Sequence, residues 1–232
     1  MKKLFGMIVV AAMMAAVMLN TRSAQAGAPS TVLATILDRM TSASRDIHSL
    51  KANISQQKVN TQIGIKGPVE AGVLYYKPLK DGRSQLRIDY NSPEVKVLVV
   101  DGDKFSLYQP ALNQELRSSI QKYSKNESAG SISLRFDAKT LEKYNISYER
   151  DEDVDGEHTS VLAFIPKPGV SAPFKRQDVW VNRETWLPAK IQLTERNNDY
   201  TWIRLGNLEK NISISNGLFS IKTKPGTQVI NG

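Results

Sequence analysis

Cysteine is absent from all 232 residues, and its absence excludes two classes of protein. A bacterial lipoprotein carries its lipid on a cysteine just after the signal segment, so this chain is not anchored in that way. Disulfide bonds are excluded too, although an exported protein could form them. A hydrophobic core must therefore stabilise the fold, and the chain is long enough for one domain with a sizeable core.

Histidine is nearly as scarce, with only His48 and His158. Without cysteine and with two histidines, most catalytic triads and metal sites lack their usual residues. The sequence also has no His-Glu-x-x-His, Gly-x-Ser-x-Gly, phosphate-binding or dinucleotide-binding motif. We therefore expect a protein that is not an enzyme and has no cofactor, with both histidines at the surface or the rim.

One acidic run, from Asp151 to Gly156, imitates the first half of a calcium-binding loop. Its carboxylates alternate and its sixth residue is glycine, but Leu162 occupies the twelfth position, where a bidentate glutamate is required. The run also lies between two expected strands instead of two helices. We interpret it as the acidic tip of a hairpin and expect no metal.

Long runs of like charge are absent as well. The formal net charge is +8, with basic residues spread along the chain. Proteins that bind nucleic acids concentrate basic residues on one element or face, so nucleic-acid binding is not expected. A mildly basic, solvated surface is the simpler interpretation.

The N-terminus contains the longest apolar run of the sequence. Lys2 and Lys3 precede it, residues 4–19 are almost wholly apolar, and Ala24-Gln25-Ala26 is a small-x-small site typical of signal peptidase substrates. The run is short for a membrane span, which needs about 20 residues. We expect residues 1–26 to be a cleaved signal peptide and residues 27–232 to form one periplasmic domain; a retained anchor is the alternative.

After this segment, the periodicity predicts one helix and then a series of strands. Ser30 is a favourable N-cap, and the apolar residues at helical spacing are Val32, Leu33, Ile36, Leu37 and Met40. From Leu50 the period changes to two. The expected strands are 50–59, 72–77, 84–90, 94–100, 104–109, 114–120, 144–150, 158–165, 176–182, 189–195, 199–205 and 218–222.

Turn signals separate these strands at hairpin spacing. They are Asp81-Gly82, Asp101-Gly102, Asp155-Gly156, Asn197-Asn198 and Asn216-Gly217. Residues 126–143 interrupt the pattern, with short helices expected at 131–136 and 137–144. The chain is thus predicted to be a single antiparallel meander with a few helices.

The hairpin around Gly102 permits a prediction of register. A three-residue loop, with Gly102 in the left-handed conformation, would pair Val97 with Phe105. A two-residue Asp101-Gly102 turn would instead pair Val97 with Ser106. Because the first register separates apolar from polar side chains, we prefer it. It predicts one apolar face made of Val95, Val97, Val99, Phe105 and Leu107.

Several segments, in order along the chain, resemble one family of known proteins. They are Ser49-Leu50-Lys51-Ala52-Asn53-Ile54-Ser55-Gln56, Gly72-Val73-Leu74-Tyr75-Tyr76-Lys77-Pro78, Leu86-Arg87-Ile88-Asp89-Tyr90-Asn91-Ser92-Pro93, Val99-Val100-Asp101-Gly102 with Tyr108-Gln109-Pro110, Leu187-Pro188-Ala189-Lys190, and Leu218-Phe219-Ser220-Ile221 with Lys224-Pro225-Gly226. This series resembles the periplasmic outer-membrane lipoprotein carriers, the LolA family. The resemblance implies a mainly β (α+β), single-domain, unclosed antiparallel β-barrel with a helical lid over a hydrophobic cavity.

The resemblance also implies a function and partners. Carriers of this family shield the acyl chains of lipoproteins and pass them from an inner-membrane ABC transporter complex to the outer membrane, where a receptor accepts them. The expected partners are thus acylated lipoproteins, that transporter and, if present, that receptor; the expected state is a monomer. The alternatives are an envelope lipid sensor or regulatory binding module, and a carrier of a different lipid.

Residues expected to line the lipid-binding cavity come from the helix, the sheet and the interrupted segment. They are Leu33, Ile36, Leu37, Met40, Leu86, Ile88, Tyr90, Val95, Val97, Val99, Phe105, Leu107, Ile132, Leu134 and Phe136. The alternative is that they pack together as a filled core, since burial has the same sequence pattern in both cases. By resemblance, Lys77 stands where the family has an arginine that latches the lid, although lysine lacks the planar fork of arginine.

Overall fold

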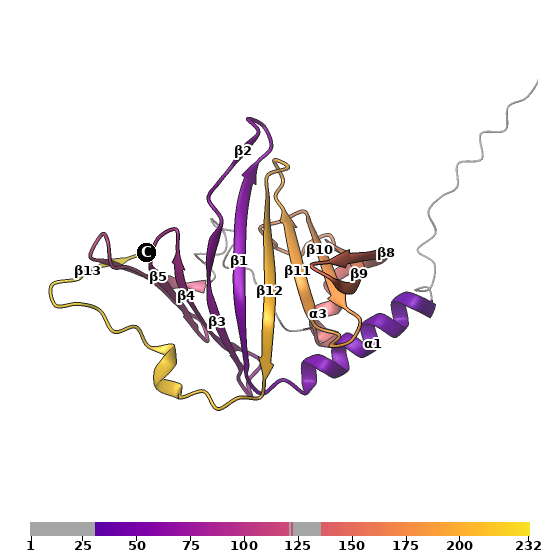
Figure 1. Cartoon of the computed structure of the whole chain (residues 1–232), viewed down its shortest axis with the longest axis horizontal. Helices are drawn as coiled ribbons and strands as arrows, with labels where there is room; N and C mark the ends of the chain where they lie inside the picture. The colour runs from indigo at the N-terminus through magenta and orange to yellow at the C-terminus, as the bar shows by residue number, and fades with distance from the viewer. Residues whose placement is uncertain (1–30, 121, 123–135) are drawn as a thin grey trace, which may run out of the picture.

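The computed structural model describes residues 31–120, 122 and 136–232; the expected signal peptide, Ile132 and Leu134 lie outside them. One sheet runs through the described chain in the order β13-β7-β6-β5-β4-β3-β1-β12-β11-β10-β9-β8, with β2 paired to β1. It does not close on itself, and α1 lies beside the β8–β12 half (Figure 1). Except for the parallel pair of β13 and β7, its neighbouring strands are antiparallel.

The helices are α1 (Thr31–Arg45), α3 (Ala138–Leu141) and the 3-10 helix η2 (Asn216–Phe219). The strands are β1 (Leu50–Asn60), β2 (Ile65–Lys66), β3 (Glu70–Pro78), β4 (Ser84–Ser92), β5 (Lys96–Asp101), β6 (Lys104–Gln109), β7 (Gln114–Ser119), β8 (Tyr144–Val154), β9 (Glu157–Pro166), β10 (Arg176–Asn182), β11 (Pro188–Thr194), β12 (Tyr200–Lys210) and β13 (Gln228–Asn231).

Eleven of the twelve expected strands are present, and the bounds of β6 and β10 agree with the prediction. The expected strand 218–222 is wrong, as is the hairpin turn at Asn216-Gly217. Residues 216–219 form η2, because the Ser215 hydroxyl accepts a hydrogen bond from the Gly217 amide and caps the turn. Strands β2 and β13 were not among the expected strands.

The preferred register of the β5–β6 hairpin is also wrong. Asp101 pairs with Lys104, so Gly102 and Asp103 form a two-residue turn, and Gly102 has a φ of 62°. Val100 therefore pairs with Phe105, and Leu98 pairs with Leu107. Val97 and Val99 point to the opposite side of the sheet from Phe105 and Leu107.

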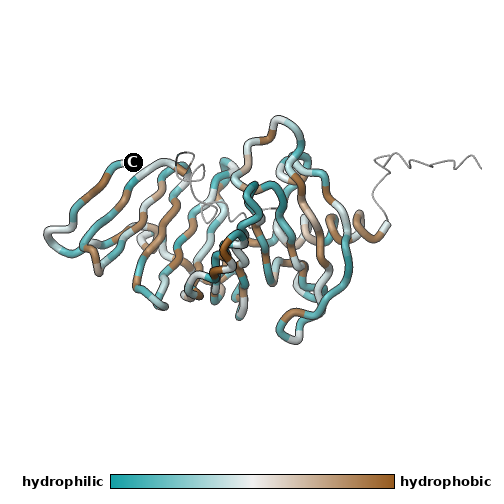
Figure 2. Tube along the Cα trace, turned by 90° about the horizontal axis from the view of Figure 1, so that it is seen from above, coloured by the Kyte–Doolittle hydropathy of each residue, from teal (hydrophilic) through white to brown (hydrophobic). Residues whose placement is uncertain are grey.

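The two faces of the sheet have different surroundings. We call inner the face whose side chains form one apolar cluster with Leu33, Ile36 and Met40 of α1, and outer the opposite face. Hydrophobic and hydrophilic residues alternate along many strands (Figure 2), as expected when a sheet buries one face. No helix within the described residues is both long and apolar enough to cross a bilayer.

Candidate functional site

The inner face brings together most of the residues predicted to line a cavity. Its cluster contains these predicted residues: Leu33, Ile36, Met40, Leu86, Ile88, Tyr90, Phe105 and Phe136, with Leu37 and Leu107 packed against them. Eight are buried, and Leu37 and Leu107 are half-buried. Residues from α1, β4, β6 and the segment before α3 thus share one apolar region.

Val95, Val97 and Val99 do not belong to this face. Val95 precedes β5 and is 59% exposed. Val97 and Val99 lie on the outer face, where Val99 is buried. The residues of β5 that do face inward are Leu98 and Val100. This correction follows from the two-residue turn at Gly102 and Asp103, which moves the partner of Phe105 from Val97 to Val100, an odd number of residues, and so exchanges the faces.

Other inner-face residues were expected to be in strands but were not assigned to the site. They include Leu74 and Tyr76 of β3, Leu162 and Phe164 of β9, and Ile191 and Ile203 of β11 and β12. Leu74, Leu162 and Ile203 are fully buried. Ile191 stands between Lys190 and Gln192 in the sequence, but Leu162 and Phe164 lie in an apolar run that does not show which face is inner.

Helix α1 covers part of this face and is joined to Phe136 at two points. The Thr41 hydroxyl donates to the Phe136 carbonyl (3.1 Å), and the Phe136 amide donates to the Ser44 hydroxyl (3.3 Å). The Phe136 ring lies 6.1 Å from that of Phe164 in β9. The helix and Phe136 therefore form one cover over the apolar cluster.

Residues 46–49, just after α1, are anchored by hydrogen bonds. The Asn211 side chain accepts from the His48 amide (2.8 Å) and donates to the Asp46 carbonyl (2.9 Å). The Ser49 hydroxyl donates to the Ile212 carbonyl (2.5 Å). Residues 46–49 are thus bonded to the segment that follows β12, whereas the buried residues of α1 itself are apolar. This arrangement suits a lid with a hinge at residues 46–49.

Below this hinge lies a small cavity among the described residues. It measures about 10 Å³ and is lined by Ile47, Leu50, Tyr76, Leu187, Pro188, Leu205 and Leu208. This is room for about one water molecule, whereas ligand pockets usually measure about 300–1,000 Å³. A long apolar ligand therefore does not fit this cavity without movement of the residues that line it.

Lys77 lies on the outer face, away from α1. Its ammonium donates to the Asn216 side-chain oxygen (2.7 Å), so it bonds to η2. Arg87 of β4 holds the same segment, donating to the carbonyls of Leu218 (2.9 Å) and Ser220 (3.2 Å). In this conformation Lys77 therefore contacts η2, and its role as a lid latch stays a prediction.

A polar cluster interrupts the apolar inner face where β3 and β5 begin. Gln56, Glu70, Tyr90 and Lys96 come together from four strands, because Gln56 pairs with Glu70 and Tyr90 pairs with Lys96. The Gln56 amide nitrogen donates to Glu70 (2.8 Å), which also accepts from Lys96. The Lys96 ammonium lies 4.7 Å from the centre of the Tyr90 ring.

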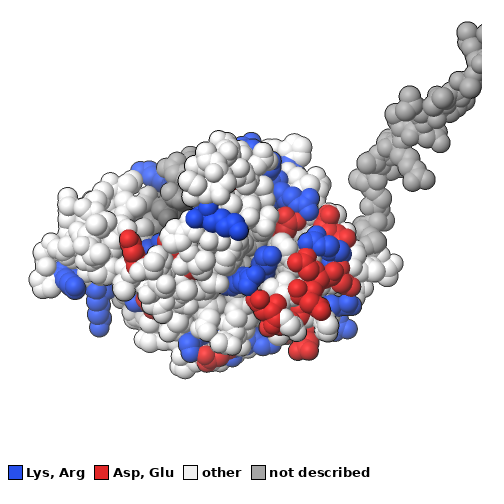
Figure 3. All heavy atoms as spheres, turned by 45° about the horizontal axis from the view of Figure 1, so that its top comes forward, with Lys and Arg blue, Asp and Glu red and all other residues white. Residues whose placement is uncertain are grey.

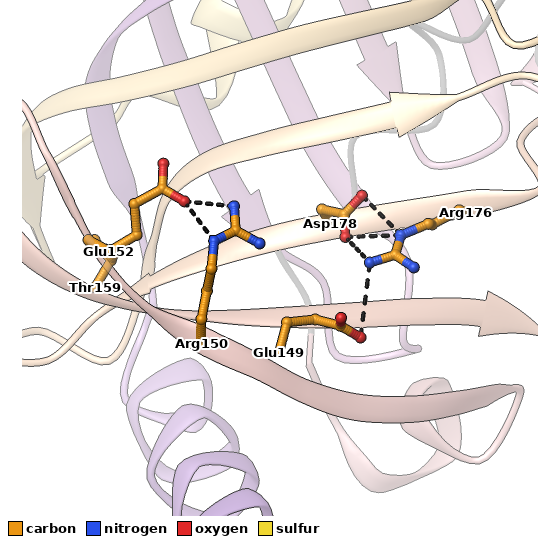
Figure 4. Close-up of polar contacts among 6 residues, drawn as sticks. All are labelled: Glu149, Arg150, Glu152, Thr159, Arg176 and Asp178. Carbon is orange, nitrogen blue, oxygen red and sulfur yellow. Dashed lines mark hydrogen bonds and ion pairs between the residues drawn. The ribbon is translucent and has the colours of Figure 1, made fainter.

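The outer face of β8–β12 is held by ion pairs. Arg176 donates its Nε to both oxygens of Asp178 (2.9 and 3.0 Å) and lies 3.7 Å from Glu149, while Arg150 pairs with Glu152 (Figure 4). The hydrogen bonds to Asp178 raise the pKa of Arg176. Carboxylates gather on one side of the molecule (Figure 3), where β8 carries several of them.

The predicted acidic hairpin tip is confirmed, since Asp155 and Gly156 form the turn between β8 and β9. Asp155 pairs with Arg204 (3.1 Å) beside an outer-face hollow of about 470 Å³. Polar side chains such as Asn53, Ser55 and Asn91 line this hollow together with Ile54 and Val73. Across residues 31–120, 122 and 136–232, no group of three or more His, Asp or Glu side chains is arranged to hold a metal ion.

The described chain thus forms an open, mainly antiparallel sheet with a helix over its apolar face. The chain belongs to the LolA family: the family model of the outer membrane lipoprotein carrier protein LolA matches residues 45–222. This confirms the predicted family and fold class. LolA-family proteins are periplasmic, and the fold indicates a lipid- or lipoprotein-binding protein.

Individual relatives are distant. Over 141 residues the chain is 26% identical to an uncharacterized protein of Methanocaldococcus jannaschii, MJ0687; the match covers 58% of this chain and 37% of that protein. An uncharacterized conserved protein from Thermus thermophilus has a similar structure, with a TM-score of 0.53 and 12% identity. The match covers 86% of this chain and 98% of that protein. The structure of MucB is also similar, with a TM-score of 0.51 and 15% identity; the match covers 84% of this chain and 65% of the MucB chain.

Proposed function

We propose that this protein is a periplasmic carrier that shields the acyl chains of lipoproteins and passes them from an inner-membrane ABC transporter to the outer membrane. The observation that carries the proposal is the continuous apolar inner face beneath α1, which joins residues from α1 and from nine strands, β1, β3–β6 and β9–β12, in one cluster. Such a site needs adaptable apolar walls and a movable cover. It needs no catalytic group, and we propose that the protein is not an enzyme.

The energetics of acyl chains favour this role. Each methylene kept from water is worth about 0.8 kcal/mol, so long chains do not cross an aqueous compartment unshielded. Against a membrane the same cavity gains little, because lipid tails already solvate the chains. Loading therefore requires an energy source such as an ATP-driven transporter, and unloading requires only a receptor of higher affinity.

Loading would follow a sequence of events. Acyl chains that enter beneath α1 would displace α1 together with Phe136, to which Thr41 and Ser44 are hydrogen-bonded. The bonds of Asn211 to residues 46 and 48 would keep α1 attached while its start moves. When the ligand leaves, Leu33, Ile36 and Met40 return to the inner face and fill the space.

The direct test is release of lipoproteins from spheroplasts. The protein, purified from the periplasm of its host, is incubated with spheroplasts and ATP, and lipoproteins in the soluble fraction are identified by mass spectrometry. We expect lipoproteins bound to the protein, and much less release by Phe105→Asn if that variant still folds. Competent spheroplasts that release nothing would refute lipoprotein carriage, and binding of extracted phospholipid or glycolipid would then identify a carrier of another lipid.

Lid movement has its own test, made clean by the absence of cysteine. Ile36→Cys places a thiol on the buried side of α1, and Ala34→Cys places one on its exposed side as the control. Maleimide should label position 34 quickly in all conditions. Labelling at position 36 should be slow in buffer and at least about tenfold faster while a ligand or detergent displaces α1. Equal rates at both positions would exclude a closed lid.

The similarity to MucB supports one other candidate, a module that senses lipid and binds a regulatory protein. The match covers 65% of the MucB chain, so MucB contains a part that this similarity does not include. Capture of a single periplasmic protein independent of lipid, without release of lipoproteins from spheroplasts, would favour this candidate over the carrier.

A further inference from the structure

The polar cluster on the inner face contains one hydrogen-bond acceptor that is not satisfied. Gln56 is 6% exposed, and its side-chain oxygen has no hydrogen-bond partner among the described residues. A buried polar atom without a partner costs free energy, and most proteins avoid it. Here it lies on the face proposed to hold acyl chains, between Ile54 and the ends of β3 and β5.

The orientation of the Gln56 amide follows from its neighbours. A carboxylate accepts hydrogen bonds but donates none, so the amide nitrogen of Gln56 must face Glu70. Glu70 also forms an ion pair with the Lys96 ammonium. If the amide were reversed, two acceptor oxygens would face each other. The Gln56 oxygen is therefore fixed away from Glu70, and an N–H or O–H donor on a ligand that enters the inner face would satisfy it.

The cluster lies at the boundary between solvent and the apolar face. The Lys96 and Glu70 side chains remain 20% and 27% exposed, whereas Gln56 and Tyr90 are buried. From this boundary the apolar residues Ile54, Leu74 and Ile88 continue along the sheet toward α1. A ligand with a polar head and apolar tails matches this order of side chains.

We propose that Gln56, Glu70 and Lys96 form a head-group subsite that recognises an acylated amide, with the Gln56 oxygen accepting the amide N–H and Lys96 donating to an acyl carbonyl oxygen. This inference rests on the proposed function, because it names the part of the ligand that the same face would select. Glu70 is a positioning residue: it orients Gln56 and Lys96 and does not touch the ligand.

The test uses two ligands that differ only in the donor. N-palmitoylglycine methyl ester carries an amide N–H, and its analogue, the palmitoyl ester of methyl glycolate, has an oxygen in place of that N–H. We expect the wild-type protein to bind the amide about tenfold more tightly than the ester, because only the amide satisfies Gln56. Displacement of an apolar fluorescent probe measures both affinities.

The variants separate the roles. Gln56→Met keeps the side-chain length but removes the acceptor, so it should bind both ligands equally while retaining affinity for the ester. Gln192→Met, on the outer face of β11, is the matched control and should keep the preference. Lys96→Met combined with Glu70→Gln removes the ion pair without leaving one charge unpaired. This double variant should bind both ligands more weakly, because both carry the acyl carbonyl that Lys96 would contact.

Two failures have different meanings. If the wild type binds neither ligand, the proposed function fails, and the subsite fails with it. If it binds both equally, or if Gln56→Met keeps the preference for the amide, the subsite is overturned and the carrier proposal stands. Unfolding curves of each variant accompany the binding data, and a variant that retains the wild-type melting midpoint gives an interpretable affinity.

Discussion

The inner and outer faces of the sheet are both partly buried, but by different means. On the inner face, α1 and Phe136 cover side chains that are almost entirely apolar. On the outer face, η2 and the residues around it lie against β4 and β5 through hydrogen bonds from Lys77 and Arg87. Apolar contacts hold the inner cover on the sheet, and lipid tails can replace these contacts at little cost. The outer cover is held by directional hydrogen bonds, which lipid tails cannot replace. The comparison therefore predicts that the inner cover moves and the outer one stays.

The largest effect is expected from removing an inner-face side chain. Leu162 is fully buried in β9. Leu162→Ala should lower the free energy of unfolding by about 3 kcal/mol, because it combines lost burial with a new cavity. Gln192→Ala on the outer face should change it by less than about 0.5 kcal/mol. Urea unfolding measures both, and equal losses would mean that the two faces contribute alike.

The next effect compares two neighbours in β5. Leu98 is 4% exposed on the inner face, and Val97 is half-buried on the outer face. Leu98→Asn should destabilise the protein by about 2–4 kcal/mol and weaken ligand binding, since it buries an amide without a partner. Val97→Asn should cost less than about 1 kcal/mol and leave binding unchanged. A larger effect of Val97→Asn than of Leu98→Asn would instead support the three-residue loop and the register expected from the sequence.

That register shows why local patterns predict strands better than faces. Residues 97–100 are Val-Leu-Val-Val, so either set of alternate residues looks suitable for burial. Both are in fact covered, because η2 approaches β5 on the outer face and Phe219 is itself buried. A cover that comes from more than a hundred residues away leaves no sign in the hairpin. Most strands could be predicted because their outer residues are polar and the alternation is clear.

The same reasoning explains what else the sequence did and did not reveal. The helical spacing of Leu33, Ile36 and Met40 predicted the buried side of α1, and these three residues do join the cluster. Residues 218–222 have a strand-like pattern, but Arg87 binds the carbonyls of Leu218 and Ser220, which a strand would use. The cluster of Gln56, Glu70 and Lys96 required the pairing of four strands, so no local pattern could predict it.

A smaller effect is expected where Arg87 holds the outer cover. Its side chain is 17% exposed and also pairs with Asp89. Arg87→Met should cost about 1–2 kcal/mol, because two carbonyl acceptors lose their donor. Hydrogen exchange of residues 216–220 should become faster, while exchange in α1 stays unchanged. Arg83→Met removes only exposed ion pairs and serves as the control, with little expected change. Faster exchange in α1 as well would show that the two covers are coupled.

The smallest effect concerns Lys190 on the outer face, whose ammonium lies 4.0 Å from the centre of the Trp180 ring. Burial lowers the pKa of Lys190 from 10.5. Between its folded-state pKa and 10.5 the unfolded chain binds more protons, so this group makes stability rise with pH in that window. Burial of Tyr144 raises the pKa of that tyrosine and has the opposite effect near its ordinary value of 10.0, so the wild type alone is ambiguous.

The difference in unfolding free energy between wild type and Lys190→Met cancels the contribution of Tyr144. This difference should shift in favour of the wild type by less than about 1 kcal/mol as the pH rises toward the ordinary lysine pKa of 10.5. Urea unfolding at a series of pH values measures it. A flat difference would mean that Lys190 is as well solvated as in the unfolded chain and that the outer face is open at this point.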